Sequence, residues 1–211
     1  MSSETPIAVT VGNAFPTGKF YIIEPSFWGG GKMPGLEIAN EEKLMLPGSF
    51  IVEPPNGDPN QYPERPHLVH LPKLGAAPRD FEELASKWIV SEHLKRVFES
   101  VDPDAFAFAA CDFTQADGTP GPAYYLCNVV RTLDALDEQA SRLKIKIGDY
   151  VNGKYYSLAG GANLIFKDDV IGSAHVFRTP FADTVFCDRA LYDAVNAAHL
   201  RGVGFLDAAE C

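Results

Sequence analysis

Cys187 and Asp188 are the residues whose types and position most directly suggest chemistry. They lie in the stretch VFCDRALYDAV (185–195), where an apolar run predicts the end of a strand and the next residues predict a helix. Backbone N–H groups at a helix N-terminus favour a thiolate, so Cys187 could be a nucleophile or a redox thiol. The alternative is structural, with Cys187 as a small buried residue and Asp188 as the N-cap of the helix. Cysteine is usually buried, which favours the structural interpretation.

A second segment repeats this pattern. Residues 89–108 align without a gap on residues 186–205, so that Val90-Ser91 falls on Cys187-Asp188. Each copy predicts an apolar strand, an N-cap residue, an amphipathic helix and a return strand. Ser91 and Asp188 are therefore predicted to be structural caps. The identity is low, so a duplication and two uses of a common unit explain the pattern equally well.

Cys187 and Cys111 define the alternative that the chain is an enzyme. A thiol-dependent hydrolase needs its cysteine within hydrogen-bond reach of a histidine, and His175 and His199 are isolated candidates for that role. No G-x-S-x-G or H-E-x-x-H motif occurs in the chain. The absence of a local catalytic motif favours a protein that is not an enzyme.

Two further patterns fail the requirements of their classes. The stretch FWGGGKMPG (27–35) resembles a phosphate loop, but Ser26 replaces the first glycine and Met33 replaces the hydroxyl residue that binds magnesium. His67 and His70 form H-x-x-H in a segment predicted to be extended, which places them on opposite faces and disfavours a shared zinc ion. The sequence therefore predicts no metal and no cofactor.

Composition indicates an ordinary globular protein. The chain has 211 residues, of which 46% are hydrophobic and 22% charged, with a formal net charge of −10. This charge disfavours nucleic-acid binding and suits a basic partner. The N-terminus lacks a basic region followed by an apolar run, and no segment approaches the roughly 18 apolar residues of a membrane helix, so we expect a cytoplasmic protein with no membrane contact. The dispersed cysteines are then expected to be free thiols: Cys111, Cys127, Cys187 and Cys211.

The predicted elements indicate an α+β fold with a mixed, mainly antiparallel sheet and a few short helices. The first third is predicted to be β-rich and free of helices, with extended runs at 6–11, 19–25, 49–54 and 66–74 and a proline-rich loop at 53–66. Asp80 is predicted to cap a short helix over 81–87, and a second helix follows Val90. Later segments predict strands at 105–110 and 123–133, a turn or short helix at 133–144, and a hairpin around Asn152-Gly153. We expect one domain over residues 1–211, with a possible N-terminal β-rich layer (1–78) beside residues 79–211.

Four segments carry a resemblance to a known family. They are Ser91-Glu92 after a strand, a tyrosine-rich strand (Tyr124-Tyr125) that leads to residues 134–137, the segment 172–178, and a last helix that ends in 202–205. In this order they resemble immunity-protein family eleven of bacterial polymorphic toxin and type VI secretion systems, formerly a domain of unknown function. The resemblance covers roughly residues 80–206, and segment 172–178 is one residue longer than the family pattern.

The resemblance implies a protein that binds and neutralises a cognate toxin, and it supplies no catalytic residues. The toxin would be the partner, with an interface to which an acidic surface contributes. Acidic and aromatic residues in the predicted polar loops are then candidates for partner contact, although an ordinary solvated loop is the commoner role for any one of them. They are Trp28, Asp58, Tyr62, Asp112 and Asp117.

Overall fold

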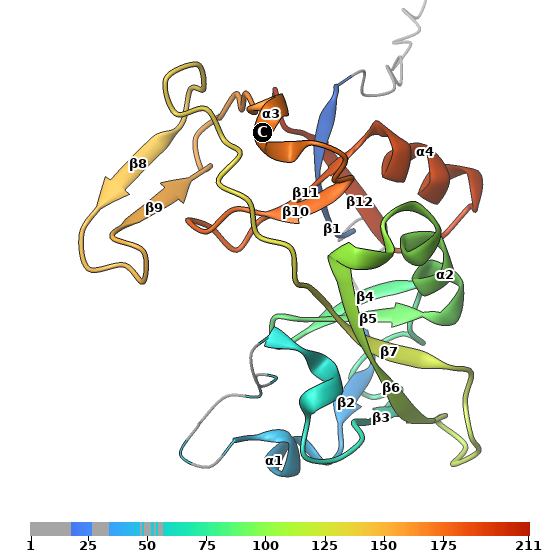
Figure 1. The fold of residues 1–211 in the computed structure, drawn as a ribbon. Helices are drawn as coiled ribbons and strands as arrows, with labels where there is room; N and C mark the ends of the chain where they lie inside the picture. Colours follow the sequence, from blue (N-terminus) through green and yellow to red (C-terminus); the bar gives the residue numbers. More distant parts are fainter. Residues whose placement is uncertain (1–17, 27–33, 47, 49–51, 53, 55–56) are drawn as a thin grey trace, which may run out of the picture.

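The computed structural model describes residues 18–26, 34–46, 48, 52, 54 and 57–211, which form an α+β fold (Figure 1). Most strand pairs are antiparallel, so the predicted fold class is confirmed. The extended run predicted at 6–11 and the glycine-rich stretch from Phe27 to Met33 lie outside the described residues. Most of the run predicted at 49–54 does so too. None of the helices that the structure describes is long and apolar enough to cross a membrane.

Two of the sheets each carry a helix. A four-stranded antiparallel sheet has the order β10-β11-β1-β12, with β10 Val176–Arg178, β11 Val185–Asp188, β1 Phe20–Pro25 and β12 Val203–Asp207. A six-stranded sheet has the order β2-β3-β6-β7-β5-β4, with β2 Leu36–Ile38, β3 His67–His70, β6 Phe106–Thr114, β7 Tyr124–Val129, β5 Lys87–Ser91 and β4 Phe81–Leu84. Helix α2 (Glu92–Val101) follows β5, and α4 (Arg189–Ala197) follows β11. Strands β3 and β6 pair in parallel, and every other strand pair that the structure describes in these two sheets is antiparallel.

A two-stranded sheet projects from one side of the molecule (Figure 1). It consists of β8 (Lys144–Ile147) and β9 (Lys154–Ser157), and we call residues 144–157 the hairpin arm. The remaining described elements are short: α1 Glu41–Leu44, α3 Asp168–Ile171, and two 3-10 turns, η2 Pro59–Gln61 and η3 Pro103–Ala105.

The sequence repeat corresponds to a shared topology. In the α2 half (β4, β5, α2, β6 and β7), strand β7 lies between β5 and β6; in the α4 half (β10, β11, α4, β12 and β1), strand β1 lies between β11 and β12. The strand orders β4-β5-β7-β6 and β10-β11-β1-β12 are therefore equivalent. Only the chain position of the central strand differs, because β7 follows the other strands of its half and β1 precedes them.

The two halves join reciprocally at the ends of their helices. The Asp102 carboxylate, which follows α2, accepts hydrogen bonds from the backbone N–H groups of residues 175 and 176 (2.8 and 3.0 Å), where β10 begins. The Arg201 carbonyl, which follows α4, accepts hydrogen bonds from the N–H groups of residues 80 and 81 (3.0 and 3.2 Å), where β4 begins. Each half thus provides acceptors for the first N–H groups of the other half's edge strand, which no neighbouring strand would otherwise pair.

The largest core cluster lies between the halves. Helices α2 and α4 pack against each other, as Figure 1 shows. Phe98 of α2 stacks on Phe106 with ring centres 4.4 Å apart, and Tyr192 of α4 stacks on Tyr21 at 4.5 Å. One further cluster covers the outer face of each sheet. The cluster on the four-stranded sheet includes Phe177 and Phe186, and the cluster on the six-stranded sheet includes Leu44 and Leu68. Both large sheets are therefore buried on both faces.

The predicted helix over 81–87 is wrong, because these residues form the β4–β5 hairpin. Phe81 and Glu82 are both buried, at 0% and 3% exposure, and Phe81 pairs with Val90. Burial on both faces of a strand overrides the helix preference of a Phe-Glu-Glu-Leu sequence. The turn residues Ala85 and Ser86 have φ of +49° and +63°, an unusual conformation for these residue types that left no turn signal in the sequence.

Other elements differ less from the prediction. Strands lie where they were expected at 19–25, 105–110 and 123–133, although β7 ends at Val129, and the hairpin around Asn152-Gly153 is present. The expectation that the first third lacks helices is wrong, since α1 and η2 lie there. Its described strands join the two large sheets and do not form a separate layer: β1 is central in one, and β2 and β3 extend the other.

Candidate functional site: the cleft and the hairpin arm

Cys187 is enclosed in the sheet of the α4 half. It pairs with Tyr21 on one neighbouring strand and with Val176 on the other, and it is completely buried. Burial raises the pKa of its thiol well above the usual range, and the adjacent Asp188 carboxylate acts in the same direction. The thiolate that a nucleophile requires is therefore disfavoured at this position.

Asp188 has two structural contacts. One carboxylate oxygen accepts hydrogen bonds from the N–H groups of Ala190 and Leu191 (3.0 and 3.3 Å) at the start of α4. The other lies 2.7 Å from Nδ1 of His175. The equivalent Ser91 accepts a hydrogen bond from the N–H of Leu94 (3.2 Å) at the start of α2. Both residues thus occupy N-cap positions in equivalent units.

The geometry that a thiol hydrolase needs does not occur in the described residues, which include every cysteine and histidine of the chain. No histidine nitrogen is hydrogen-bonded to a thiol: His175 contacts Asp188, and His67 Nε2 lies 2.8 Å from the Thr114 hydroxyl oxygen. Burial raises the pKa of Cys111 to about 12, and its thiol donates to the carbonyl of Ala109. Nothing around Cys187 or Cys111 supports the enzyme alternative. His67 and His70 lie in β3 with the strand spacing that places them on opposite faces.

We expect thiol reactivity to follow this burial. Cys111, Cys127 and Cys187 are buried, with thiol pKa values raised by desolvation, whereas Cys211 is partly exposed. With a thiol-reactive chromophore at pH 8, the native protein should therefore label slowly at Cys211 and fail to label at the other three, all of which should react in denaturant. Rapid labelling of Cys187 in the native protein would contradict this account of the thiol.

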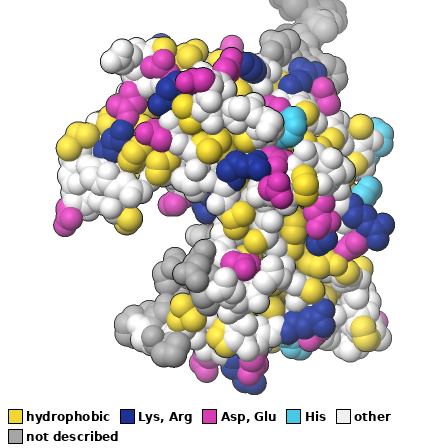
Figure 2. Space-filling model, viewed as in Figure 1, with side chains coloured by type: hydrophobic (Ala, Val, Ile, Leu, Met, Phe, Trp, Pro, Cys, Tyr) yellow, Lys and Arg dark blue, Asp and Glu magenta, His cyan; other side chains and the backbone are white. Residues whose placement is uncertain are grey.

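A cleft of about 570 Å³ opens between the two halves, on the side of the molecule that is hollowed beneath the hairpin arm (Figure 2). Its walls come from Val52, Pro54 and the segment 57–62, from the end of β4 with the turn and the start of β5 (83–88), from β7 (126–129), and from β10 with the loop to β11 (178–185). These four segments are distant in sequence. The cleft exists only because the halves are joined.

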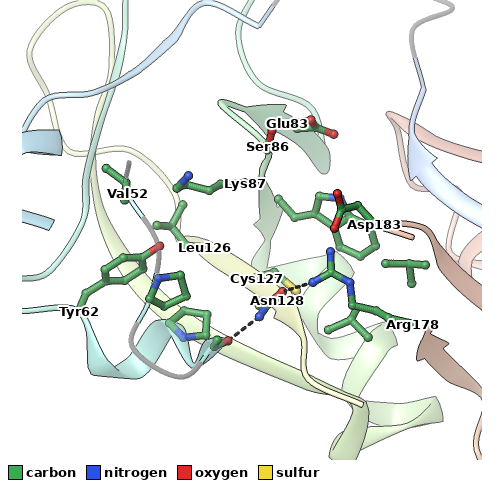
Figure 3. Close-up of a pocket in the computed structure, with 16 residues that line it drawn as sticks. Val52, Tyr62, Glu83, Ser86, Lys87, Leu126, Cys127, Asn128, Arg178 and Asp183 are labelled. Carbon is green, nitrogen blue, oxygen red and sulfur yellow. Dashed lines mark hydrogen bonds between the residues drawn. The ribbon is translucent and has the colours of Figure 1, made fainter. Parts of the chain in front are cut away.

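Polar side chains define the cleft (Figure 3). Asn128 on β7 donates to the Gly57 carbonyl and accepts a hydrogen bond from Arg178 on β10 (3.2 Å), so it ties three of the walls together. Glu83 and Asp183 are exposed, form no ion pair with any described residue, and lie on the side opposite Tyr62 in Figure 3. The cleft therefore presents two carboxylates that a basic group of a partner could reach, together with the basic side chains of Lys87 and Arg178.

The structure brings two of the five predicted contact residues to this region. Tyr62 lines the cleft, and Asp58 lies in the same loop, where its carboxylate accepts a hydrogen bond from the N–H of Asn60 (2.9 Å) that lowers its pKa. Asp112 lies on β6 at 3.4 Å from Arg65, and Asp117 accepts hydrogen bonds from the Thr119 hydroxyl and N–H that lower its pKa.

Asp112 and Asp117 do not line the cleft, and Trp28 lies outside the described residues. The role of all five as partner contacts stays a prediction.

The hairpin arm carries an exposed apolar surface that sequence analysis did not identify. Its exposed large apolar side chains are Ile147 (78% exposed), Tyr150, Val151 (fully exposed) and Tyr155, and Tyr150 stacks on Tyr155 at 5.6 Å. No other described helix, strand or hairpin carries more than one large exposed apolar side chain. A concentration of this kind is typical of an interaction surface. The Asn152-Gly153 turn predicted the hairpin, but a turn sequence does not show which strands lie at a sheet edge.

The arm and the cleft adjoin each other through one loop. The Tyr156 N–H of β9 donates to the Phe181 carbonyl (2.8 Å), and the Asn152 amide donates to the Pro180 carbonyl (2.6 Å). Asp183, two residues after Phe181, lines the cleft. The exposed arm and the wall of the cleft that carries Asp183 therefore form one continuous candidate surface.

Comparison with known proteins supports the resemblance found in the sequence. The model of the immunity protein family Imm11 matches residues 19–210, which is nearly the whole chain and includes the first third. None of the curated proteins compared with the chain matches it.

Proposed function

Since the chain belongs to the Imm11 immunity protein family, we propose that it protects the cell that makes it by binding a cognate toxin in a stoichiometric complex. The family match over residues 19–210 is the observation that carries this proposal. The environments of Cys111 and Cys187 support binding over catalysis, because both thiols are buried and burial raises their pKa values.

We further propose that the toxin belongs to a polymorphic toxin system, such as one delivered by type VI secretion, and that the complex forms in the cytoplasm. The formal net charge of −10 favours a toxin with a basic surface. Opposite charges would accelerate the encounter and select the correct partner more than they would increase affinity. Glu83 and Asp183 in the cleft are then suited to receive a lysine or arginine of the toxin.

The proposal is tested with the toxin encoded beside this gene. We expect co-expression to restore growth, and the two purified chains to elute as one complex of defined stoichiometry in light scattering. If toxin activity is measured while the protein is titrated, inhibition should rise linearly and reach completion at the equivalence point of that complex. The absence of both a complex and growth rescue would refute the proposed function.

The same titration separates binding from catalysis. An enzyme that modifies the toxin would inhibit it at far below one equivalent, given time, whereas a binder cannot. Replacing Cys187 with Val should leave protection intact, because Cys187 is a buried packing residue. Loss of protection in a Cys187→Val protein that is folded normally would instead support the thiol-dependent alternative.

A further inference from the structure

The register of the hairpin arm shows which backbone groups of β8 point away from β9. Tyr156 is opposite Ile145, and the Tyr156 N–H donates to Phe181 on the side away from β8. In an antiparallel pair, two opposite residues either both bond across the pair or both point outward. Ile145 therefore directs its N–H and C=O away from β9. Because outward groups recur every second residue, Ile147 does the same.

This outer edge of β8 is open. No residue in the described part of the chain hydrogen-bonds the backbone N–H or C=O of Ile145 or Ile147, and the sheet has only the two strands β8 and β9. An edge of this kind is a template for a further strand. A two-stranded sheet is also marginally stable by itself, so a third strand would stabilise the arm.

Side chains of β8 specify the chemistry of such a strand. Ile145 and Ile147 share one face, and Lys144 and Lys146 share the other. Lys144 forms no ion pair with a described residue, and the Lys146 ammonium lies 5.8 Å from the centre of the Tyr155 ring on the same face. A strand added beside β8 would place its residues alternately next to the isoleucines and next to the lysines.

A second copy of this chain is a poor occupant of the edge. Two β8 strands side by side would bring their lysines together, and lysine at an edge strand is a common device against self-pairing. The lysines instead match acidic side chains, and Ile147, which is 78% exposed, matches an apolar one.

We propose that β8 is the docking edge for an extended segment of the cognate toxin, in which apolar and acidic residues alternate, and which adds to β8–β9 as a third strand. This inference rests on the proposed function, because it names the surface that the toxin-binding protein uses. Main-chain hydrogen bonds to Ile145 and Ile147 provide the affinity, and the lysines select the segment. Glu83 and Asp183 in the cleft beside the arm can at the same time receive basic residues of the same toxin.

Amide hydrogen exchange tests the docking edge directly, using the toxin encoded beside this gene as the probe. In the free protein, the amides of Ile145 and Ile147 should exchange rapidly, whereas the Lys146 amide, which bonds across to β9, should exchange slowly. In the complex, exchange at Ile145 and Ile147 should slow by about 100-fold or more, with little change at Lys146. A complex in which Ile145 and Ile147 exchange as fast as in the free protein overturns the proposal.

Substitution at Ile147 provides a second measurement with a matched control. Ile147→Pro removes an N–H that faces outward, and an edge strand tolerates proline at such a position. The proline ring would, however, occupy the space that an added strand needs. Ile147→Thr keeps the N–H and removes only apolar surface. We expect Ile147→Pro to weaken toxin binding by about 100-fold and Ile147→Thr by less than about 10-fold, with unchanged thermal stability in both. Lys144→Glu with Lys146→Glu should weaken binding by about 10-fold at low salt.

The outcomes separate this proposal from the one it rests on. A wild-type protein that does not bind the toxin refutes the proposed function and this inference with it. A wild-type protein that binds, with Ile147→Pro and Ile147→Thr equally affected, leaves the function in place and overturns the docking edge. An edge that serves a second copy would appear as a dimer that Ile147→Pro dissociates without change in toxin affinity, and this result also overturns the proposal.

Discussion

Replacing Asp102 with Ala is expected to lower the free energy of unfolding by about 3–5 kcal/mol, the range for removing one partner of a buried ion pair. Asp102 is 5% exposed, and its carboxylate accepts hydrogen bonds from Arg131 and from the backbone N–H groups of residues 175 and 176. The variant leaves the N–H groups of residues 175 and 176 without their acceptor and the Arg131 guanidinium with only the Val176 carbonyl, and desolvated unpaired donors are costly. Because these donors start β10, the damage falls on the joint between the halves.

Asp104 provides the matched control, since it lies two residues later and is exposed, with no hydrogen bond to a described residue. Asp104→Ala should change stability by less than about 0.5 kcal/mol, as surface substitutions usually do. Urea unfolding, followed by circular dichroism, measures both. Equal stability of Asp102→Ala and Asp104→Ala would contradict the role assigned to Asp102.

Gly202→Ala is the second substitution with a large expected effect, a loss of at least about 3 kcal/mol from positive-φ strain together with a backbone clash. Gly202 has φ of +88°, and a Cβ at this position would lie 2.5 Å from the Phe81 carbonyl oxygen. The clash is with backbone, so β4 must move. That movement would disturb the hydrogen bonds from residues 80 and 81 to the Arg201 carbonyl, which form the other side of the joint.

Gly118→Ala separates the two causes. Gly118 has a nearly equal φ of +84°, but nothing lies within 4 Å of the position of its Cβ. It should therefore show only the cost of the left-handed conformation, about 1 kcal/mol. Thermal unfolding measures the stability lost in each variant. The difference between the two losses is the contribution of the contact with the Phe81 carbonyl. If Gly118→Ala and Gly202→Ala lose the same stability, the contact with Phe81 has no energetic role.

Asp102→Ala and Gly202→Ala both affect the joint that brings the walls of the cleft together. Arg178 lies in β10, whose first N–H groups bind Asp102, and Glu83 lies in β4, whose first N–H groups bind the Arg201 carbonyl. A weakened joint should therefore reduce protection in cells even though neither substituted residue lines the cleft. Comparison with Ile147→Pro, which leaves the joint intact, separates loss of the fold from loss of the docking edge.

The family resemblance was carried by residues that the structure shows to be structural. Ser91 occupies an N-cap, and Gly202 has the left-handed conformation and close backbone approach that only glycine accommodates. Such positions are readable from sequence because the chemistry of a cap or a tight turn depends on the residue itself. They identify the family but do not reveal a binding surface.

The sequence by itself determined the local units: helices α2 and α4 with their N-caps, the strands around them, and their repetition. Periodicity, capping and turn residues act over a few neighbouring positions, so they are present in a single segment. Only the tertiary structure decided that 81–87 is a hairpin, because burial of Phe81 and Glu82 overrides local helix preference.

The surfaces also depended on tertiary structure. The cleft brings together segments between residues 52 and 185 that no spacing rule connects. Strand β8 has an open edge only because β9 is the one described strand that pairs with it. Exposure and edge position arise from what the rest of the chain leaves uncovered, and this is a property of the whole fold and not of any one segment.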